Sequence, residues 1–260
     1  MVTQSRWSDL DGRTHWLDVG GPVDAPPIVA VHGLGGSHTN WLAVAPDLAT
    51  DHRVYALDLA GHGHTPTEQR GTDVVANERL LHRFIVEVVG QPVTLLGNSM
   101  GGLLSSRFAQ RHPGSLAGLV LCGAVVGDWT WARDVLQEDE MPPPPDDWSG
   151  MSRDPQTVHE YATDPLVYRD TYKRPLLEAE VIALDRFTEQ IGLVDIPVLF
   201  LHGDEDPFVP YRTSLAAAKA FPTYDLTVRV YPGARHEVLN EINRSEVIAE
   251  VADFCTRVAP

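Results

Sequence analysis

The sequence predicts an α/β fold in which a mostly parallel β-sheet is flanked by helices on both faces. Short runs of valine, isoleucine and leucine alternate along the chain with longer segments whose apolar residues recur at helical spacing. Most of the apolar runs end in a glycine-bearing loop, as in "VHGLGG" and "LLGNSMGG". Strands that are apolar on both sides are typical of parallel sheets covered by helices.

Composition narrows the class of protein. The chain has 260 residues, 43% of them hydrophobic, and a formal net charge of −16. Such an acidic surface disfavours nucleic acid as a partner, because nucleic acids need clustered lysine and arginine. No run reaches the roughly 18 apolar residues of a membrane helix, and the first residues lack the pattern of a signal peptide. We therefore expect a cytoplasmic protein without a membrane span, in which Cys122 and Cys255 are buried free thiols.

The elements follow in order along the chain. Residues 3–10 and 14–19 alternate in polarity, and we expect them to pair as antiparallel strands at one edge of the sheet. The further strands are expected at 28–31, 54–57, within 92–98, within 116–126, within 196–203 and within 226–232. Helices are expected at 74–89, after Ser99 as far as His112, at 211–221 and at 245–258.

One region interrupts this alternation. Residues 128–190 contain no clear strand, so we expect a partly helical cap inserted into a core formed by 1–127 and 191–260. Such a cap would fold over the carboxyl edge of the sheet, where open α/β sheets bind ligands. Its proline run, Pro142–Pro145, is interpreted as a stiff hinge. We expect that some of its large apolar side chains line an apolar passage while others pack on the core, the candidates being Trp129, Trp131, Met141, Trp148 and Met151.

Ser99 is the candidate nucleophile. It stands between Gly97 and Gly101, after an apolar strand and before a helix. A Gly-x-Ser-x-Gly match alone is weak, but this context predicts a strained turn that projects the hydroxyl above the sheet. Any Cβ at the two glycines would collide with the neighbouring strand or helix.

A serine hydroxyl needs a base, and the base needs an orienting carboxylate. His236 follows the last strand in a glycine-bearing loop, and Asp206 ends the loop after the preceding strand. The order Ser99, Asp206, His236 is the order expected for a nucleophile elbow of this kind. Asp204 and Asp128 remain open as alternatives for the acid.

Backbone N–H groups would hold the developing oxyanion. "HGLGG" at 32–36 follows an early strand, and we assign one donor to Leu34 and the other to Met100, which follows the nucleophile.

A metal site at His62, His64 and Asp58 is a weaker alternative, because a third strong ligand is missing at suitable spacing. We expect no metal. His32 and His202 each precede a glycine at a strand end and are interpreted as structural side chains that bond to loop backbone.

Taken together, these segments resemble the α/β-hydrolase superfamily over nearly the whole length, through "HGLGG", "DLAGHGHT", "GNSMGG", "HGDEDPFVP" and "ARHE". The resemblance implies an eight-stranded, mostly parallel sheet with a cap after the sixth strand, and no metal or organic cofactor. The C-terminal half is similar to monoacylglycerol lipases and lysophospholipases, although these usually carry histidine where this chain has Asn98. "GNSMGG" is also similar to C–C bond hydrolases of aromatic degradation, which usually place tryptophan after the catalytic histidine, where this chain has Glu237.

The resulting hypothesis is a serine carboxylic-ester hydrolase that acts on a small-molecule ester or lipid with an apolar acyl chain, similar to a monoacylglycerol. The alternatives are a C–C bond hydrolase of a ring-fission product, a thioesterase or lactonase, and a non-catalytic ligand receptor built on the same fold.

Overall fold

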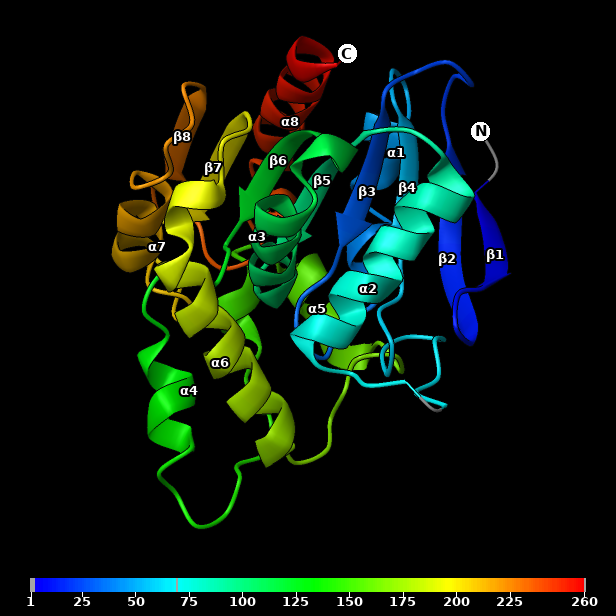
Figure 1. Ribbon diagram of the computed structural model, residues 1–260. Helices are drawn as coiled ribbons and strands as arrows, with labels where there is room; N and C mark the ends of the chain where they lie inside the picture. Colours follow the sequence, from blue (N-terminus) through cyan, green and yellow to red (C-terminus); the bar gives the residue numbers. More distant parts are fainter. Residues whose placement is uncertain (1–2, 69, 260) are drawn as a thin grey trace.

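The computed structural model describes residues 3–68 and 70–259, and within them the strands form an eight-stranded sheet of order β1-β2-β4-β3-β5-β6-β7-β8 (Figure 1). The first two strands run antiparallel to their neighbours, and the others are parallel. The predicted fold class and the antiparallel pair at one edge are therefore confirmed. The strands are β1 (Gln4–Asp9), β2 (Arg13–Gly20), β3 (Pro27–Val31), β4 (Arg53–Leu57), β5 (Val93–Asn98), β6 (Leu116–Cys122), β7 (Val198–Gly203) and β8 (Leu226–Tyr231).

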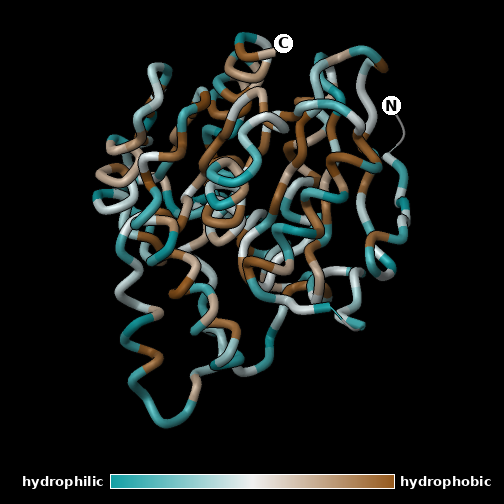
Figure 2. The backbone as a smooth tube through the Cα atoms, viewed as in Figure 1, coloured by the Kyte–Doolittle hydropathy of each residue, from teal (hydrophilic) through white to brown (hydrophobic). Residues whose placement is uncertain are grey.

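Helices cover both faces of the sheet because successive side chains of each central strand point to opposite faces. On β3, Ile28 and Ala30 join the apolar cluster formed with α1 and α8, whereas Val29 and Val31 join the cluster formed with α2, α3 and α6. Figure 2 shows this core as brown segments along the central strands. The helices are α1 (Ala45–Leu48), α2 (Val74–Phe84), α3 (Met100–Arg111), α4 (Thr130–Val135), α5 (Pro155–Thr163), α6 (Arg174–Glu189), α7 (Tyr211–Ala218) and α8 (Arg244–Val258).

Local signals set the ends of the helices. The side chain of Asp73 caps α2 by accepting a hydrogen bond from the N–H of Ala76. The helical segment expected at 74–89 has the right length, but its last turn, Ile85–Val89, is π-helical and ends at Gly90 in the left-handed conformation, with φ of +75°. α3 ends at Arg111, two residues before Pro113.

The segment 128–190 lies between β6 and β7 and contains α4, α5 and α6. In Figure 1, α4 and the first part of α6 extend past the carboxyl ends of the strands. The second half of α6 returns to the core, because Leu184 and Phe187 are buried in the same apolar cluster as Phe108 of α3. The second half of α6, which ends the predicted cap, therefore packs as part of the helical layer that covers the sheet. The division of the chain into a core and a cap remains a prediction.

Two further expectations concern single features. Cys122 and Cys255 are free and buried, as predicted. None of the described helices combines the length and the apolarity needed to cross a bilayer.

Candidate active site

The turn at Ser99 joins β5 to α3 and is strained. Ser99 has φ of +54° and ψ of −122°, a backbone conformation that residues other than glycine rarely adopt. The two flanking glycines are required by close approach. A Cβ on Gly97 would lie 2.5 Å from the carbonyl oxygen of Gly101, and a Cβ on Gly101 would lie 2.3 Å from the carbonyl oxygen of Val31. The collisions expected from the sequence are present, and the turn lifts Ser99 onto the carboxyl edge of the sheet.

His236 lies in the loop after β8, and its imidazole is oriented by Asp206. The Nδ1 atom of His236 is 2.8 Å from Oδ2 of Asp206, and both side chains are buried, at 6% and 0% exposure. The ring of Phe208 packs edge-on against the imidazole, with 5.4 Å between the centroids. Because Nδ1 donates to the carboxylate, Nε2 of His236 is left as the basic nitrogen.

The carboxylate of Asp206 has hydrogen-bond partners on both oxygens. Oδ1 accepts from the backbone N–H groups of Phe208 and Val209, at 2.8 and 3.0 Å, and Oδ2 also accepts from Nε2 of His202 at 3.1 Å. Burial tends to raise the pKa of Asp206, but the charges and hydrogen bonds of His236 and His202 outweigh burial and lower the pKa. The group is therefore ionised at neutral pH.

The same contacts act on His236. Burial lowers the pKa of His236, but the charge of Asp206, its hydrogen bond and the charge of Glu237 outweigh burial and raise the pKa. A raised pKa makes the imidazole a stronger base towards a neighbouring hydroxyl.

The two alternative acids lie elsewhere. Asp204 is exposed and accepts a hydrogen bond from the backbone N–H of Gly233 at 2.6 Å. Asp128 is exposed and faces Arg133 at 3.5 Å. Neither makes a described contact with His236, so the geometry favours Asp206 as the acid.

Ser99 and His236 line the same cavity, which has a volume of about 440 Å³. The insertion 128–190 supplies much of its wall, and four of the five large side chains expected there do line it, whereas half-buried Met141 packs against the core cluster instead. No aspartate, glutamate, lysine or arginine is among the described residues of this wall. The lining consists of Leu34, Ser99, Trp129, Trp131, Pro142, Pro143, Pro145, Trp148, Met151, Tyr161, Tyr172, Pro207, Phe208, Val209 and His236.

Several lining residues were not among the sequence candidates. Tyr161 of α5 and Tyr172 before α6 contribute phenol rings, and three prolines of the run interpreted as a hinge form part of the wall. The sequence feature that could have indicated these residues is their position in the same insertion as the tryptophans. That position does not distinguish a tyrosine that faces the cavity from one that packs elsewhere.

The backbone N–H groups of Leu34 and Met100 remain the predicted oxyanion donors. Leu34 lines the cavity, and Met100 is the first residue of α3, so its N–H has no partner within the helix. Across the described ranges, neither backbone N–H donates a hydrogen bond to another protein group. An anion beside Ser99 would also be favoured by the positive end of the α3 dipole.

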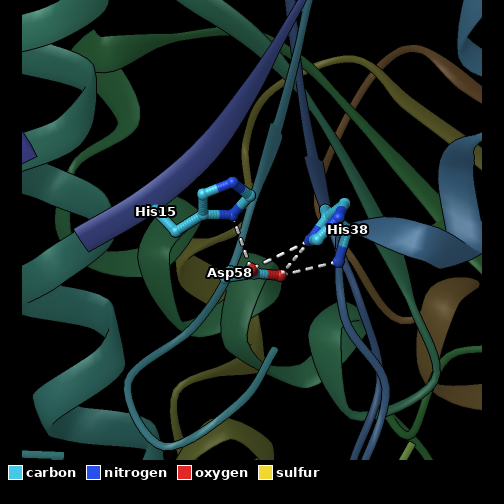
Figure 3. Close-up of side chains that lie close together, drawn as sticks. All are labelled: His15, His38 and Asp58. Atoms are coloured by element: carbon cyan, nitrogen blue, oxygen red, sulfur yellow. Dashed lines mark hydrogen bonds and ion pairs between the residues drawn. The ribbon is translucent and has the colours of Figure 1, made fainter. Parts of the chain in front are cut away.

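The alternative metal site has a different composition from the one considered in the sequence. Figure 3 shows His15 and His38 directed at Asp58. Nδ1 of His15 lies 2.7 Å from Oδ2 of Asp58, and Nδ1 of His38 lies 2.9 Å from the same oxygen. Of the two histidines considered, His62 contacts the carbonyl of Ala60, and His64 donates only its backbone N–H to Asp58, at 2.9 Å.

The buried carboxylate of Asp58 also accepts the backbone N–H of His38 at 2.7 Å. Four N–H groups thus satisfy it, while Nε2 of His15 is 2.7 Å from Oγ of Ser5. Burial tends to raise the pKa of Asp58, but the hydrogen bonds of His15 and His38 outweigh burial and lower the pKa. This is the geometry of a hydrogen-bonded carboxylate that ties β2, the turn at His38 and the loop at 58–64 together, and the absence of a metal remains a prediction.

The two structural histidines behave as expected. Nδ1 of His32 bonds to the carbonyl of Gly33 at 2.8 Å, and burial lowers the pKa of His32 to about 3. Nε2 of His202 bonds to the carbonyl of Val209 at 3.0 Å in addition to Asp206. His32 therefore stays neutral, and both histidines hold loops of the site in place.

Known proteins resemble this chain both in sequence and in fold. A family model described as "Serine aminopeptidase, S33" matches residues 25–243. The chain is 27% identical over 215 residues to a monoacylglycerol lipase of Mycolicibacterium smegmatis, covering 77% of each protein. It is 26% identical over 273 aligned positions to 2-hydroxy-6-oxononadienedioate/2-hydroxy-6-oxononatrienedioate hydrolase 1 of Dechloromonas aromatica, covering 95% of this chain and 92% of that one. The crystal structure of Paleococcus ferrophilus monoacylglycerol lipase superposes with a TM-score of 0.82 at 24% identity, covering 95% of this chain and 99% of that one.

The resemblance seen in the sequence is thereby confirmed, since the match to the family model spans most of the chain and the fold agrees with that of a solved lipase. The chain belongs to this serine aminopeptidase family of α/β-hydrolases, and among its members it is similar to monoacylglycerol lipases.

Proposed function

We propose that the protein is a serine carboxylic-ester hydrolase whose substrate is an ester of an apolar acyl chain, similar to a monoacylglycerol. The observation that carries the proposal is the pairing of His236 with buried Asp206 at the wall of a cavity that Ser99 also lines. Similarity to a monoacylglycerol lipase over 77% of the chain supports the substrate class.

In this mechanism Nε2 of His236 takes the proton of Ser99 while Oγ attacks the ester carbonyl. The backbone N–H groups of Leu34 and Met100 hold the resulting oxyanion. When the tetrahedral intermediate collapses, the proton on His236 passes to the leaving alcohol and the acyl group stays on Ser99. His236 then removes a proton from water, which attacks the acyl-enzyme. When this second intermediate collapses, the proton on His236 returns to Oγ of Ser99 and the fatty acid is released. Asp206 remains ionised throughout and stabilises the imidazolium.

The cavity supports an apolar acyl group. Tryptophan, proline and tyrosine rings form most of its wall, and such surfaces stabilise hydrocarbon by roughly 25 cal/mol per Å² removed from water. A dicarboxylate dienoate, the substrate class named for the Dechloromonas relative, would meet no described lysine or arginine in this wall. We further propose that residues 128–190 act as a cap over this cavity.

The test is a series of initial rates on monoacylglycerols and p-nitrophenyl esters with two to sixteen acyl carbons. Ser99→Ala is expected to lower kcat by a factor of at least ~10⁴. Ser106→Ala is the matched control, since Ser106 is a buried serine on α3, the helix that follows Ser99, but does not line the cavity. Rates that peak at medium or long chains support the acyl cavity.

Other outcomes would overturn the proposal in distinct ways. Activity that persists in Ser99→Ala rejects the nucleophile. Turnover of ring-fission dienoates, thioesters or lactones without ester hydrolysis favours one of those activities instead. Tight ligand binding without turnover in the wild type identifies a receptor.

A further inference from the structure

Glu237 is a buried carboxylate next to the candidate base, and the proposed mechanism does not use it. Its relative exposure is 5%. Oε1 accepts a hydrogen bond from Nδ2 of Asn98 at 2.6 Å and a longer one from Nδ2 of Asn40 at 3.4 Å. Oε2 accepts one from Nδ2 of Asn240 at 3.2 Å. Three asparagine amides therefore converge on one carboxylate.

Each asparagine belongs to a different part of the site. Asn98 is the last residue of β5 and immediately precedes Ser99. Asn40 belongs to the turn after the glycine-rich loop of Leu34, and its Oδ1 accepts the N–H of Ser37 at the end of that loop, at 3.1 Å. The third asparagine lies three residues beyond Glu237, in the loop that carries the base. The carboxylate thus joins the nucleophile turn, the oxyanion loop and the histidine loop.

The backbone at Glu237 is itself fixed, because its N–H donates to the carbonyl of Met151 at 2.8 Å. Its side chain is the element that reaches across to the other two loops. Asn98 and Glu237 are 139 residues apart in the sequence, so this bond is a tertiary contact that local chain geometry does not supply.

Among the described residues, four titratable groups interact electrostatically with Glu237, namely His236, Asp206, Tyr161 and Cys122. Burial raises the pKa of Glu237, and its negative charge acts on His236 in the same direction as that of Asp206, raising the pKa of the imidazole. Glu237 can therefore affect the site both through position and through charge.

We propose that Glu237 is a positioning residue that holds Ser99, His236 and the N–H of Leu34 in register through Asn98, Asn240 and Asn40. The inference rests on the proposed function, because it assigns these groups their catalytic roles. A carboxylate suits this position since the side-chain groups that hydrogen-bond to it are all amide donors, whereas a glutamine side chain would turn its own N–H₂ towards one of them. Since Glu237 is not among the described residues that line the Ser99 cavity, we expect its loss to act on the chemical step and to leave substrate binding intact.

The experiment compares Glu237→Gln, Asn98→Ala and the double variant with the wild type. Kinetics on p-nitrophenyl butyrate give kcat and KM, a series of buffers gives the pH profile of kcat/KM, and thermal unfolding reports stability. Glu78→Gln is the matched control, because Glu78 is also a buried carboxylate, at 2% exposure, but pairs with Arg111 at 3.0 Å on the helical layer away from the cavity.

For Glu237→Gln we expect kcat to fall by about 10- to 100-fold with KM within twofold, because misplacement of catalytic groups by ~1 Å has costs of this size. The acidic limb of the profile should move to lower pH, since a negative charge beside His236 is removed. Asn98→Ala should lower kcat without that shift, and the double variant should lose less than the product of the two single losses. Glu78→Gln should lower the unfolding temperature and leave kcat and the pH profile unchanged.

Two results would overturn the proposal. One is a Glu237→Gln variant that is less stable but keeps the wild-type kcat and pH profile, which would make the contact structural only. The other, decisive if Glu237→Gln does not fold, is a folded Asn98→Ala variant with wild-type kcat.

Failure of the proposed function is distinguished by a reagent that needs no substrate. The rate constant for modification of Ser99 by a fluorophosphonate reports the alignment of nucleophile and base directly. If the wild type hydrolyses no ester, slower modification in Glu237→Gln than in Glu78→Gln still supports the positioning role. Equal rates in the two variants would reject it.

Discussion

Oδ2 of Asp206 lies 2.8 Å from Nδ1 of His236, and neither side chain is open to solvent. The first prediction follows from this pair. Asp206→Asn can turn its N–H₂ towards Nδ1 and favour the wrong tautomer, so we expect kcat to fall by about 10³- to 10⁴-fold. Asp204→Asn, an exposed control two residues away, should stay within about threefold. Steady-state kinetics on the same ester check both, and the opposite ranking would mean that the acid is Asp204.

The pH dependence of the rate tests the electrostatics of His236. Its pKa is raised above the ordinary value of 6.5, and the proposed base must be neutral to take the proton of Ser99. Activity should therefore be lost as pH falls through a value above 6.5 in the wild type. The profile of kcat/KM measures this, since it reports groups of the free enzyme. A midpoint below 6.5 would show that burial, rather than the two carboxylates, dominates at this imidazole.

Backbone strain at Ser99 predicts an effect on stability. Ser99→Ala and Ser99→Gly both remove the hydroxyl, but only glycine adopts a φ of +54° without strain. We expect Ser99→Gly to be more stable than Ser99→Ala by about 1 kcal/mol, after the larger backbone entropy of unfolded glycine is subtracted. Urea unfolding of the two inactive variants measures the difference. Equal stabilities would mean that the turn is relaxed.

The cluster around Asp58 predicts stability without metal. Asp58→Asn would place an amide N–H₂ among N–H donors, and we expect a loss of about 2–4 kcal/mol in the free energy of unfolding. Asp18→Asn, which breaks the partly exposed pair with Arg53, should cost no more than about 1 kcal/mol. Chemical denaturation compares them.

The unfolding temperature of the wild-type protein should be the same with and without a chelator. A fall in the unfolding temperature that Zn²⁺ reverses would instead identify His15, His38 and Asp58 as metal ligands.

Glu180 on α6 predicts a pH-dependent stability. It is 1% exposed, neither of its oxygens has a partner among the described residues, and burial raises its pKa to about 8. The pKa of Glu180 is about 4.5 in the unfolded chain and about 8 in the folded protein, so between these pH values only the folded state keeps the proton. This contribution to stability is therefore fully present below pH 4.5 and is lost as pH rises to about 8.

Glu180→Gln should therefore match the wild type at pH 5 and unfold several degrees higher at pH 9. Glu178→Gln, an exposed neighbour on the same helix, should leave the pH dependence unchanged. Thermal unfolding at the two pH values decides this, and equal shifts at both would mean that Glu180 is ionised in the folded protein.

The sequence predicted the elements that depend on short-range rules. Strands such as 28–31 follow from continuous apolar runs, and the strained turn follows from a serine between two glycines at a strand end. The residues of the proposed triad could be selected because each follows its own strand, and parallel strands bring their carboxyl ends to one edge. The lining of the cavity was less predictable. Met141 and Tyr161 occur in the same insertion, yet Tyr161 faces the cavity and Met141 packs on the core.

Sequence alone determined the class of fold and the strained turn at Ser99, and it predicted the order of the proposed nucleophile, acid and base. Periodicity, glycine and strand ends are local properties of the chain. Only the tertiary structure decided which residues from distant parts of the chain meet. His15 reaches Asp58 over 43 residues and Asn98 reaches Glu237 over 139. Such contacts depend on the packing of whole elements, since a buried carboxylate takes its donors from whichever loops the sheet brings to it.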